Sequence, residues 1–310
     1  MGLLVNLAFV FIAGLITALA TGLGAIPFFF VEEFSDRWNV ALWGIASGIM
    51  VAASLFGLVN EGLAYASDGL PTLMIGGLVA GVVLVEVADR VLDATDIGGG
   101  DHDHTSDDEH TRDAAVTATS DEAPLSGGDG SAHDHDHPID VEAFAAGDLK
   151  TLVLILGILT VHSFPEGVAV GVSFAELGLE GGVGVFGLSV PLLAVFMTIA
   201  ISIHNIPEGT AIAIPMRAMG LSKWRMVGAA VFSSLPQPIG AVIAFAFVTW
   251  AESFLPFGFG FAAGAMIYLV FTEFIPEALA TGVDLPGRGY GELATGIVAG
   301  VLVMLPLLSV

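Results

Sequence analysis

Two stretches of the sequence share one pattern: a histidine is followed four residues later by a glutamate, with a proline directly before the glutamate. VHSFPEGVAV, residues 161–170, contains His162 and Glu166, and IHNIPEGTAI, residues 203–212, contains His204 and Glu208. In a helix, residues four apart lie on the same face. Imidazole and carboxylate groups are common ligands of divalent ions such as Zn²⁺ and Fe²⁺. Two such helices facing each other would therefore offer four ligands to one ion.

Both stretches also contain residues that open a helix locally. Pro165 and Pro207 have no N–H group, so carbonyl groups one turn earlier lose their helical partners and can face a cavity or an ion. Gly167 and Gly209 allow a neighbouring backbone to come close just beyond each glutamate. Neither stretch contains a lysine or arginine that would neutralise the acids. Structural pairing of each histidine with a glutamate is the alternative, but the repetition favours metal binding.

The elements that carry these residues must be membrane helices. The chain has 310 residues, of which 55% are hydrophobic and 13% charged, and its mean hydropathy is +0.85; soluble domains carry about 25% charged residues. Crossing a hydrocarbon core of about 30 Å takes about 20 helical residues. We predict an all-α polytopic membrane protein with eight transmembrane helices. The eight apolar segments are 4–29, 38–59, 70–91, 149–174, 185–215, 227–250, 257–279 and 290–308.

Small residues recur within these segments at a spacing of four. GxxxG pairs let helix backbones approach closely in lipid, so their repetition predicts a tightly packed bundle. The chain has no cysteine, which excludes thiolate metal ligands and disulfides. The five pairs are Gly44 and Gly48, Gly77 and Gly81, Gly167 and Gly171, Gly260 and Gly264, and Gly296 and Gly300.

The basic residues predict the orientation of the chain. All eight lysines and arginines lie in odd-numbered connections between the predicted helices. Cytoplasmic loops are enriched in Lys and Arg, so we expect these connections in the cytoplasm and both termini outside, in a multi-pass protein of the cell membrane. Residues 1–92 then form helices one to three, residues 93–148 form a linker, and residues 149–310 form helices four to eight.

The linker is the most polar part of the chain. Seventeen of the 32 acidic residues lie between Asp89 and Lys150, and large apolar residues are scarce there, so we predict a disordered cytoplasmic segment. The net charge of −24 opposes nucleic-acid binding. The linker histidines indicate loose metal handling, with an acidic spacer as the alternative. They are His102, His104, His110, His133, His135 and His137.

Together the two motifs resemble those of the ZIP family of divalent metal (zinc/iron) transporters. The similarity extends to ASGIMVAASLFGL at 46–58, SSLPQPIGAV at 233–242 and FAAGAMIYLVFTEFIPEAL at 261–279. The resemblance implies that the protein carries Zn²⁺, or else Fe²⁺, Mn²⁺ or Cd²⁺, into the cytoplasm as its substrate. It also implies a homodimer in the lipid bilayer and an ion site between the fourth and fifth helices.

The resemblance further assigns roles to single residues. Met50 occupies a position where family members can offer a thioether, with a gap-filling core methionine as the alternative. A second, adjacent ion site would use Ser163, Asn205 and Gln237, which are neutral here where some relatives have Asp or Glu. Neutral oxygens do not offset the charge of a second dication, so we expect one tightly held ion.

Three further acids are candidates for the path of the ion. Glu273 and Glu277 lie four residues apart near the cytoplasmic end of the seventh predicted helix, and Glu61 lies near the outer end of the second. We expect Glu273 and Glu277 to receive ions leaving the site, and Glu61 to attract ions at entry. Solvated acids at helix ends are the alternative for all three.

Two other functions compete with transport by a carrier. An intramembrane metalloenzyme would be expected to use an HExxH motif, in which the glutamate beside a histidine acts as a base, and neither stretch contains one. A metal-selective channel would favour several weak sites, an alternative that the sequence leaves open. We expect a transporter and not an enzyme.

Overall fold

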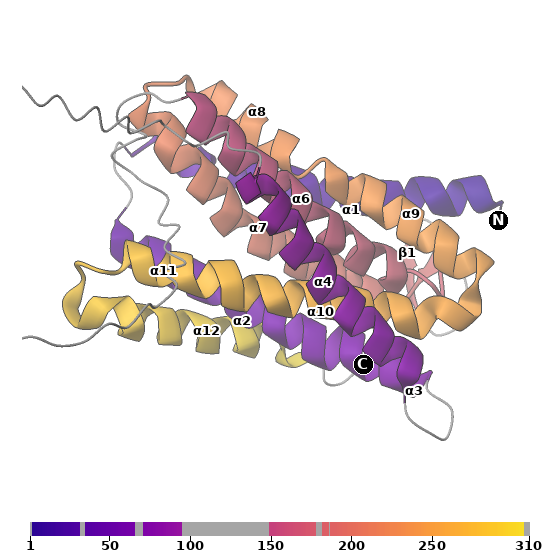
Figure 1. Cartoon of the computed structure of the whole chain (residues 1–310). Helices are drawn as coiled ribbons and strands as arrows, with labels where there is room; N and C mark the ends of the chain where they lie inside the picture. Colours follow the sequence, from indigo (N-terminus) through magenta and orange to yellow (C-terminus); the bar gives the residue numbers. More distant parts are fainter. Residues whose placement is uncertain are drawn as a thin grey trace, which may run out of the picture.

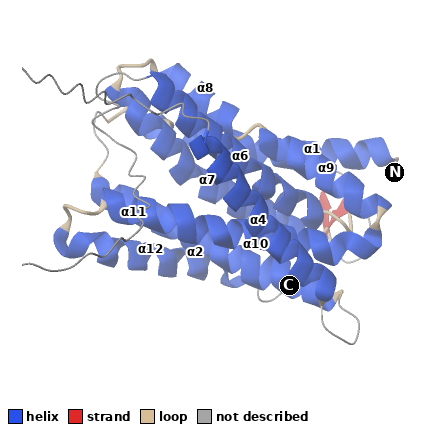
Figure 2. Cartoon of the chain, in the orientation of Figure 1, coloured by secondary structure: helices blue, strands red, loops and turns tan. Residues whose placement is uncertain are grey.

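The structure is a computed structural model of a mostly helical chain (Figure 2). It describes residues 2–31, 35–65, 71–94, 149–177, 182–185 and 187–306. The six linker histidines predicted to handle metal lie outside the described residues. The helical elements are α1 (Leu3–Leu23), η1 (Ile26–Phe29), α2 (Asp36–Ala52), η2 (Ala53–Val59), α3 (Asn60–Ala64), α4 (Thr72–Ala94), α6 (Leu149–Ser173), α7 (Leu192–Ala218), α8 (Lys223–Ser233), α9 (Pro236–Trp250), η3 (Glu252–Phe254), α10 (Leu255–Leu269), η4 (Val270–Phe274), α11 (Ile275–Thr281), η5 (Pro286–Gly289) and α12 (Tyr290–Met304).

Six segments among the described residues are long and apolar enough to cross a membrane. They coincide with six of the eight predicted segments, and several run continuously through more than one helical element, as α2, η2 and α3 do. The other two predicted segments correspond to α6, which has 25 residues, and to α12, which has 15. The six segments are Leu3–Leu23, Asp36–Ala64, Thr72–Val91, Leu192–Ala218, Lys223–Trp250 and Glu252–Thr281.

The structure differs from the all-helical prediction between α6 and α7. Strands β1 (Val183–Val185) and β2 (Leu188–Val190) form an antiparallel hairpin, with Val183 opposite Val190. Valine favours extended backbone, and Gly187 in the turn has a φ of +80° that glycine adopts without strain. The predicted fifth segment therefore began too early, because α7 starts at Leu192, directly after Pro191.

Glycines bring the helices together in pairs. A methyl group added at any of the ten GxxxG glycines would lie between 2.0 and 2.5 Å from a backbone oxygen of a neighbouring helix. The pairs formed in this way are α2 with α12, α4 with α10, and α6 with α9, and α2 and α12 can be followed side by side in Figure 1. The predicted close packing at these glycines is confirmed.

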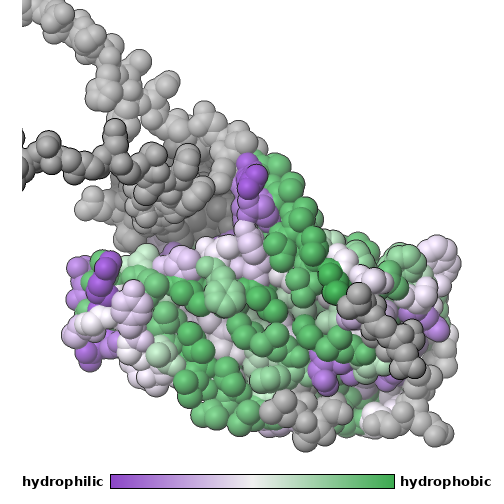
Figure 3. Space-filling view, turned by 60° about the horizontal axis from the view of Figure 1, so that its bottom comes forward, coloured by the Kyte–Doolittle hydropathy of each residue, from purple (hydrophilic) through white to green (hydrophobic). Residues whose placement is uncertain are grey.

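The outer surface of the helices is strongly apolar. Hydrophobic residues cover much of the face in Figure 3, and hydrophilic residues lie at its left end and in smaller patches elsewhere. Large exposed side chains on several helices, among them Leu4, Phe271 and Val298, contribute to the apolar surface. Such a surface fits a lipid environment, because a soluble monomer rarely exposes so large an apolar area.

We expect the substitution Gly48→Ala to lower the stability of the protein by about 1–3 kcal/mol, the usual cost of an oversized side chain in a packed interface. The added methyl group would lie 2.2 Å from the carbonyl oxygen of Ile297 on α12. Gly76→Ala is the matched control, because nothing lies within 4 Å of a methyl group there. Thermal unfolding in detergent measures the difference, and equal midpoints for the two variants would contradict the packing described here.

Candidate metal centre

The first group of candidate ligands lies between α6 and α7. His204 Nε2 is 3.2 Å from Glu166 Oε1 and 3.3 Å from Glu208 Oε1. The three residues are almost completely buried, with exposed fractions of 0–2%, and one ligand atom from each lies within 4.8 Å of the other two. Two carboxylates buried this deeply are costly without a compensating positive charge. A divalent cation bound among these atoms would supply that charge.

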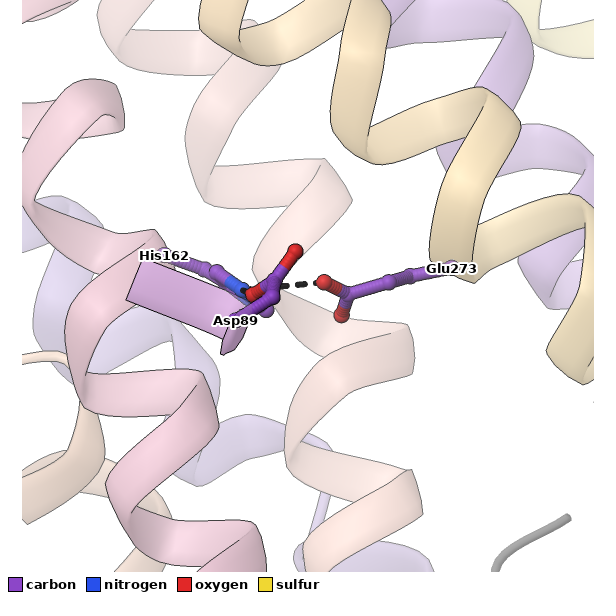
Figure 4. A group of neighbouring side chains, drawn as sticks. All are labelled: Asp89, His162 and Glu273. Atoms are coloured by element: carbon purple, nitrogen blue, oxygen red, sulfur yellow. Dashed lines mark hydrogen bonds and ion pairs between the residues drawn. The ribbon is translucent and has the colours of Figure 1, made fainter. Parts of the chain in front are cut away.

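His162 belongs to a second group and not to the first. Its Nε2 atom lies 2.9 Å from Glu273 Oε1 and 3.2 Å from Asp89 Oδ1, so α4, α6 and η4 each contribute one side chain (Figure 4). The imidazole is buried, whereas the side chains of Asp89 and Glu273 are 29% and 27% exposed. The structure thus brings together three of the four residues predicted to form one site and places the fourth beside two other carboxylates.

Asp89 is the residue of this second group that the sequence analysis missed. The predicted segment 70–91 contains Asp89, but in the sequence analysis it is grouped with the acids of the linker and given no role. In the structure α4 continues to Ala94 and holds Asp89 within the helix. A signal was present in the sequence, because Asp89 lies near the cytoplasmic end of the third predicted helix, as Glu273 does on the seventh. Only the packing of α4 and η4 against α6 shows that Asp89 and Glu273 meet at His162.

The turn η4 contacts both groups of ligands. It is a wide π-helical turn, a form that often marks functional sites. Glu273 in this turn reaches His162, and the next residue, Phe274, stacks on the imidazole of His204 with 5.0 Å between ring centroids and 25° between planes. Trp43 of α2 packs against the Phe274 ring, with 5.1 Å between the ring centroids. The aromatic contacts hold the His204 ring in the orientation that faces the two glutamates.

Two of the predicted second-site residues form a hydrogen-bonded chain that ends on Glu166. The Asn205 amide donates to the carbonyl oxygen of Thr17 at 2.7 Å and to Gln237 Oε1 at 3.0 Å. The Gln237 amide in turn donates to Glu166 Oε2. Ser163, the third of these residues, is also buried. This series of hydrogen bonds places the N–H donor of Gln237 at Glu166 Oε2, the carboxylate oxygen that does not face His204.

The glycines that follow the two glutamates accept close backbone contacts. A methyl group at Gly209 would lie 1.8 Å from the carbonyl oxygen of Thr21 on α1, and one at Gly167 would lie 2.2 Å from that of Gln237 on α9. The close approach predicted beyond each glutamate is confirmed. It brings α1 and α9 directly against the helix turns that carry the candidate ligands.

The remaining predicted residues lie outside both groups. Met50 is buried and, with His204, lines a small apolar pocket between α2, α7 and α10. Glu61 in α3 and Glu277 in α11 are half-buried, and within the described part of the chain neither belongs to a cluster of metal-ligating side chains. Met50 therefore shares a pocket with one member of the first group of ligands.

Long apolar helices that enclose two groups of imidazole and carboxylate ligands define a class of protein. It is a multi-pass membrane protein with candidate sites for divalent cations inside its helix bundle.

Comparison with known proteins gives the family. The model of the ZIP zinc transporter family matches residues 3–307. Zinc transporter ZIPB of Bordetella bronchiseptica is 30% identical over 301 residues, which cover 97% of this chain and 81% of the relative. A candidate zinc transporter of Arabidopsis thaliana is 35% identical over 261 residues, or 84% of this chain and 33% of the relative. Zinc transporter ZIP11 of Homo sapiens is 38% identical over 133 residues, or 43% and 37%. The chain thus spans about a third of the length of the last two relatives. It belongs to the ZIP zinc transporter family.

Proposed function

We propose that this protein carries divalent metal ions, chiefly Zn²⁺, across the cell membrane into the cytoplasm. The observation that supports this most directly is the buried group of Glu166, His204 and Glu208, which has the ligand types of a zinc site and, among the described residues, no lysine or arginine paired with it. Family membership supports the same function. Zn²⁺ is the transported substrate in this proposal, and Fe²⁺, Mn²⁺ and Cd²⁺ suit the same nitrogen and oxygen ligands.

The second group is proposed as the next position of the ion on its way inward. His162 precedes Glu166 by one helical turn on α6, and α6 begins where the linker ends, so His162 lies nearer the linker end of the bundle. Asp89 and Glu273 are partly exposed, which suits a site from which an ion is released into water. Glu277 lies one turn further along the same helix and would take part in release, as Glu61 would in entry.

The proposed topology has eight transmembrane helices with both termini outside. Six candidate spans, the 25-residue helix α6 and the shorter α12 make up the eight. The turns after α1, α7 and α11 lie at one end of the bundle, while α1 begins and β1 lies at the other (Figure 1). The basic residues in those turns support a cytoplasmic position for them. A homodimer in the bilayer, with the linker histidines handling metal in the cytoplasm, completes the proposal.

Transport is favoured over catalysis, because the relatives bear the names of transporters. A metal-selective channel is the second candidate, and the two ligand groups in succession are the feature that favours it, since channels use several sites along a path. The two candidates differ in how flux depends on metal concentration.

The function is tested by zinc uptake into sealed vesicles that contain the purified protein and an internal fluorescent chelator. We expect uptake well above that of protein-free vesicles. We also expect uptake to saturate as the external Zn²⁺ concentration rises, because each protein has few buried sites and one must be filled before each transfer. Flux that rises without saturation would favour the channel, and uptake equal to that of empty vesicles would contradict transport of Zn²⁺.

A further inference from the structure

Three of the eight basic residues of this acidic chain lie together where α7 turns into α8. Arg217 is in the last turn of α7, and Lys223 and Arg225 are in the first turn of α8. We call residues 217–225 the α7–α8 corner. Because α7 and α8 both belong to candidate membrane spans, the short turn between them must lie at a surface of the bilayer.

Lys223 links this corner to η1, the short helical turn that follows α1. Its ammonium group donates to the carbonyl oxygen of Phe29 in η1 at 2.8 Å and lies 5.6 Å from the centroid of the Phe29 ring. The Trp224 ring packs edge-on against the same phenylalanine, with 5.3 Å between centroids. These contacts of Lys223 and Trp224 with Phe29 hold the α7–α8 corner against η1.

The two arginines of the corner have no carboxylate partner among the described residues. Arg225 is exposed and Arg217 half-buried, and within the part of the chain that the structure describes neither forms an ion pair. The arginines of two other connections differ, since Arg37 pairs with Glu292 and Arg90 with Glu86. A guanidinium group can bind an oxyanion such as a phosphodiester through two parallel N–H···O hydrogen bonds.

Two large aromatic side chains are exposed in the segments that meet at the corner. Trp224, between Lys223 and Arg225 in sequence, is 76% exposed, and Phe30, directly after η1, is 86% exposed. Tryptophan is enriched at the level of lipid headgroups, where its ring contacts the acyl region and its N–H group contacts polar groups. An exposed tryptophan and phenylalanine would be unfavourable in water, so their exposure here indicates contact with lipid.

We propose that the α7–α8 corner binds the headgroup of an anionic phospholipid. Arg217 and Arg225 contact the phosphate, and Trp224 and Phe30 lie against the glycerol and the upper part of the acyl chains. Charge complementarity supports a lipid as the occupant, because a basic surface at the bilayer boundary attracts anionic lipids. The bound lipid then contacts the ends of α1, α7 and α8 at once, and of these α7 carries His204 and Glu208.

The experiment measures which lipids lie next to Trp224. Full-length protein is reconstituted in phosphatidylcholine with equal amounts of either brominated phosphatidylglycerol or brominated phosphatidylcholine, whose bromines quench nearby tryptophans. The signal of Trp224 is the difference between the wild-type protein and Trp224→Phe. We expect quenching of Trp224 to indicate roughly five- to thirtyfold stronger association of phosphatidylglycerol, which is the preference that one to two basic residues near a membrane surface provide.

Paired variants test whether the corner is responsible. Arg217→Gln combined with Arg225→Gln should bring the preference close to one, whereas the matched control, Arg37→Gln combined with Arg288→Gln, removes the same charge from other connections and should keep the preference. Equal quenching by both lipids in the wild type, or an equal loss in the control, would overturn the proposal. Loss of the preference on adding inorganic phosphate would show a site for the free anion and would overturn it as well. The readout does not depend on metal transport.

Discussion

Zinc flux into vesicles is expected to fall by at least about 100-fold when either His204 or Glu208 is replaced by alanine. Even residues that only orient metal ligands change affinity by roughly 10–100-fold, and these two side chains are proposed to hold the ion directly. His204 Nε2 lies 3.2 and 3.3 Å from oxygens of the two glutamates. Either substitution removes one ligand of the ion. His204→Ala also leaves the two buried carboxylates of Glu166 and Glu208 without the imidazole that both contact. Uptake is measured in the vesicle assay at equal protein content.

The matched control for these variants is Ser202→Ala on the same helix. Ser202 is half-buried and donates to the carbonyl oxygen of Thr198 one turn earlier, so its hydroxyl serves only its own helix. The control should keep flux within about twofold of the wild type, since surface or local changes usually cost little. Normal flux in His204→Ala or Glu208→Ala, with protein inserted at wild-type amounts, would rule out the first group as the transport site.

The number of tightly held ions is expected to rise from one to two when Asn205→Asp is combined with Gln237→Glu. At present the Gln237 amide donates to Glu166 Oε2 and the Asn205 amide donates to Gln237. An N–H group at that oxygen repels a cation. The double substitution removes both donors and adds two carboxylates, enough negative charge to offset a second dication beside Glu166.

Bound Zn²⁺ or Cd²⁺ is counted by elemental analysis of purified protein after dialysis. The background carries glutamine in place of the six linker histidines, together with Asp89→Asn and Glu273→Gln, so that only ions at the first group are counted. Asn39→Asp combined with Asn60→Asp serves as the control, because it adds two carboxylates elsewhere on the helices. Two tight ions before the double substitution, or one ion after it, would contradict the role given to Gln237.

The candidate site could be predicted from the sequence where spacing within one helix or a repeated motif indicates its geometry. The spacing of His204 and Glu208 places both on one face of any helix, and the repeated motif indicated that Glu166 would face them. The partners of His162 depend on how α4 and η4 pack against α6. No spacing within one helix contains that information, which is why Asp89 was missed and His162 was assigned to the first group.

The same distinction applies to the fold. The GxxxG spacing of Gly44 and Gly48 predicted a close helix contact, but the partner α12 was known only from the structure. The predicted fifth helix includes residues 185–190, because a short stretch rich in valine does not show by periodicity whether it is a strand or a helix. Pro191 marked the true start of the helix that follows.

We expect the wide turn η4 to make the proposed metal selectivity a shared property of the two ligand groups. Glu273 and Phe274 are consecutive residues, yet one contacts His162 and the other contacts His204. A change in the winding of this turn must displace both side chains together, so substitutions near either histidine should have non-additive effects. Attempts to redesign the preferred metal at one group will therefore alter the other. The smallest unit that can be engineered independently is the pair of groups with the turn between them.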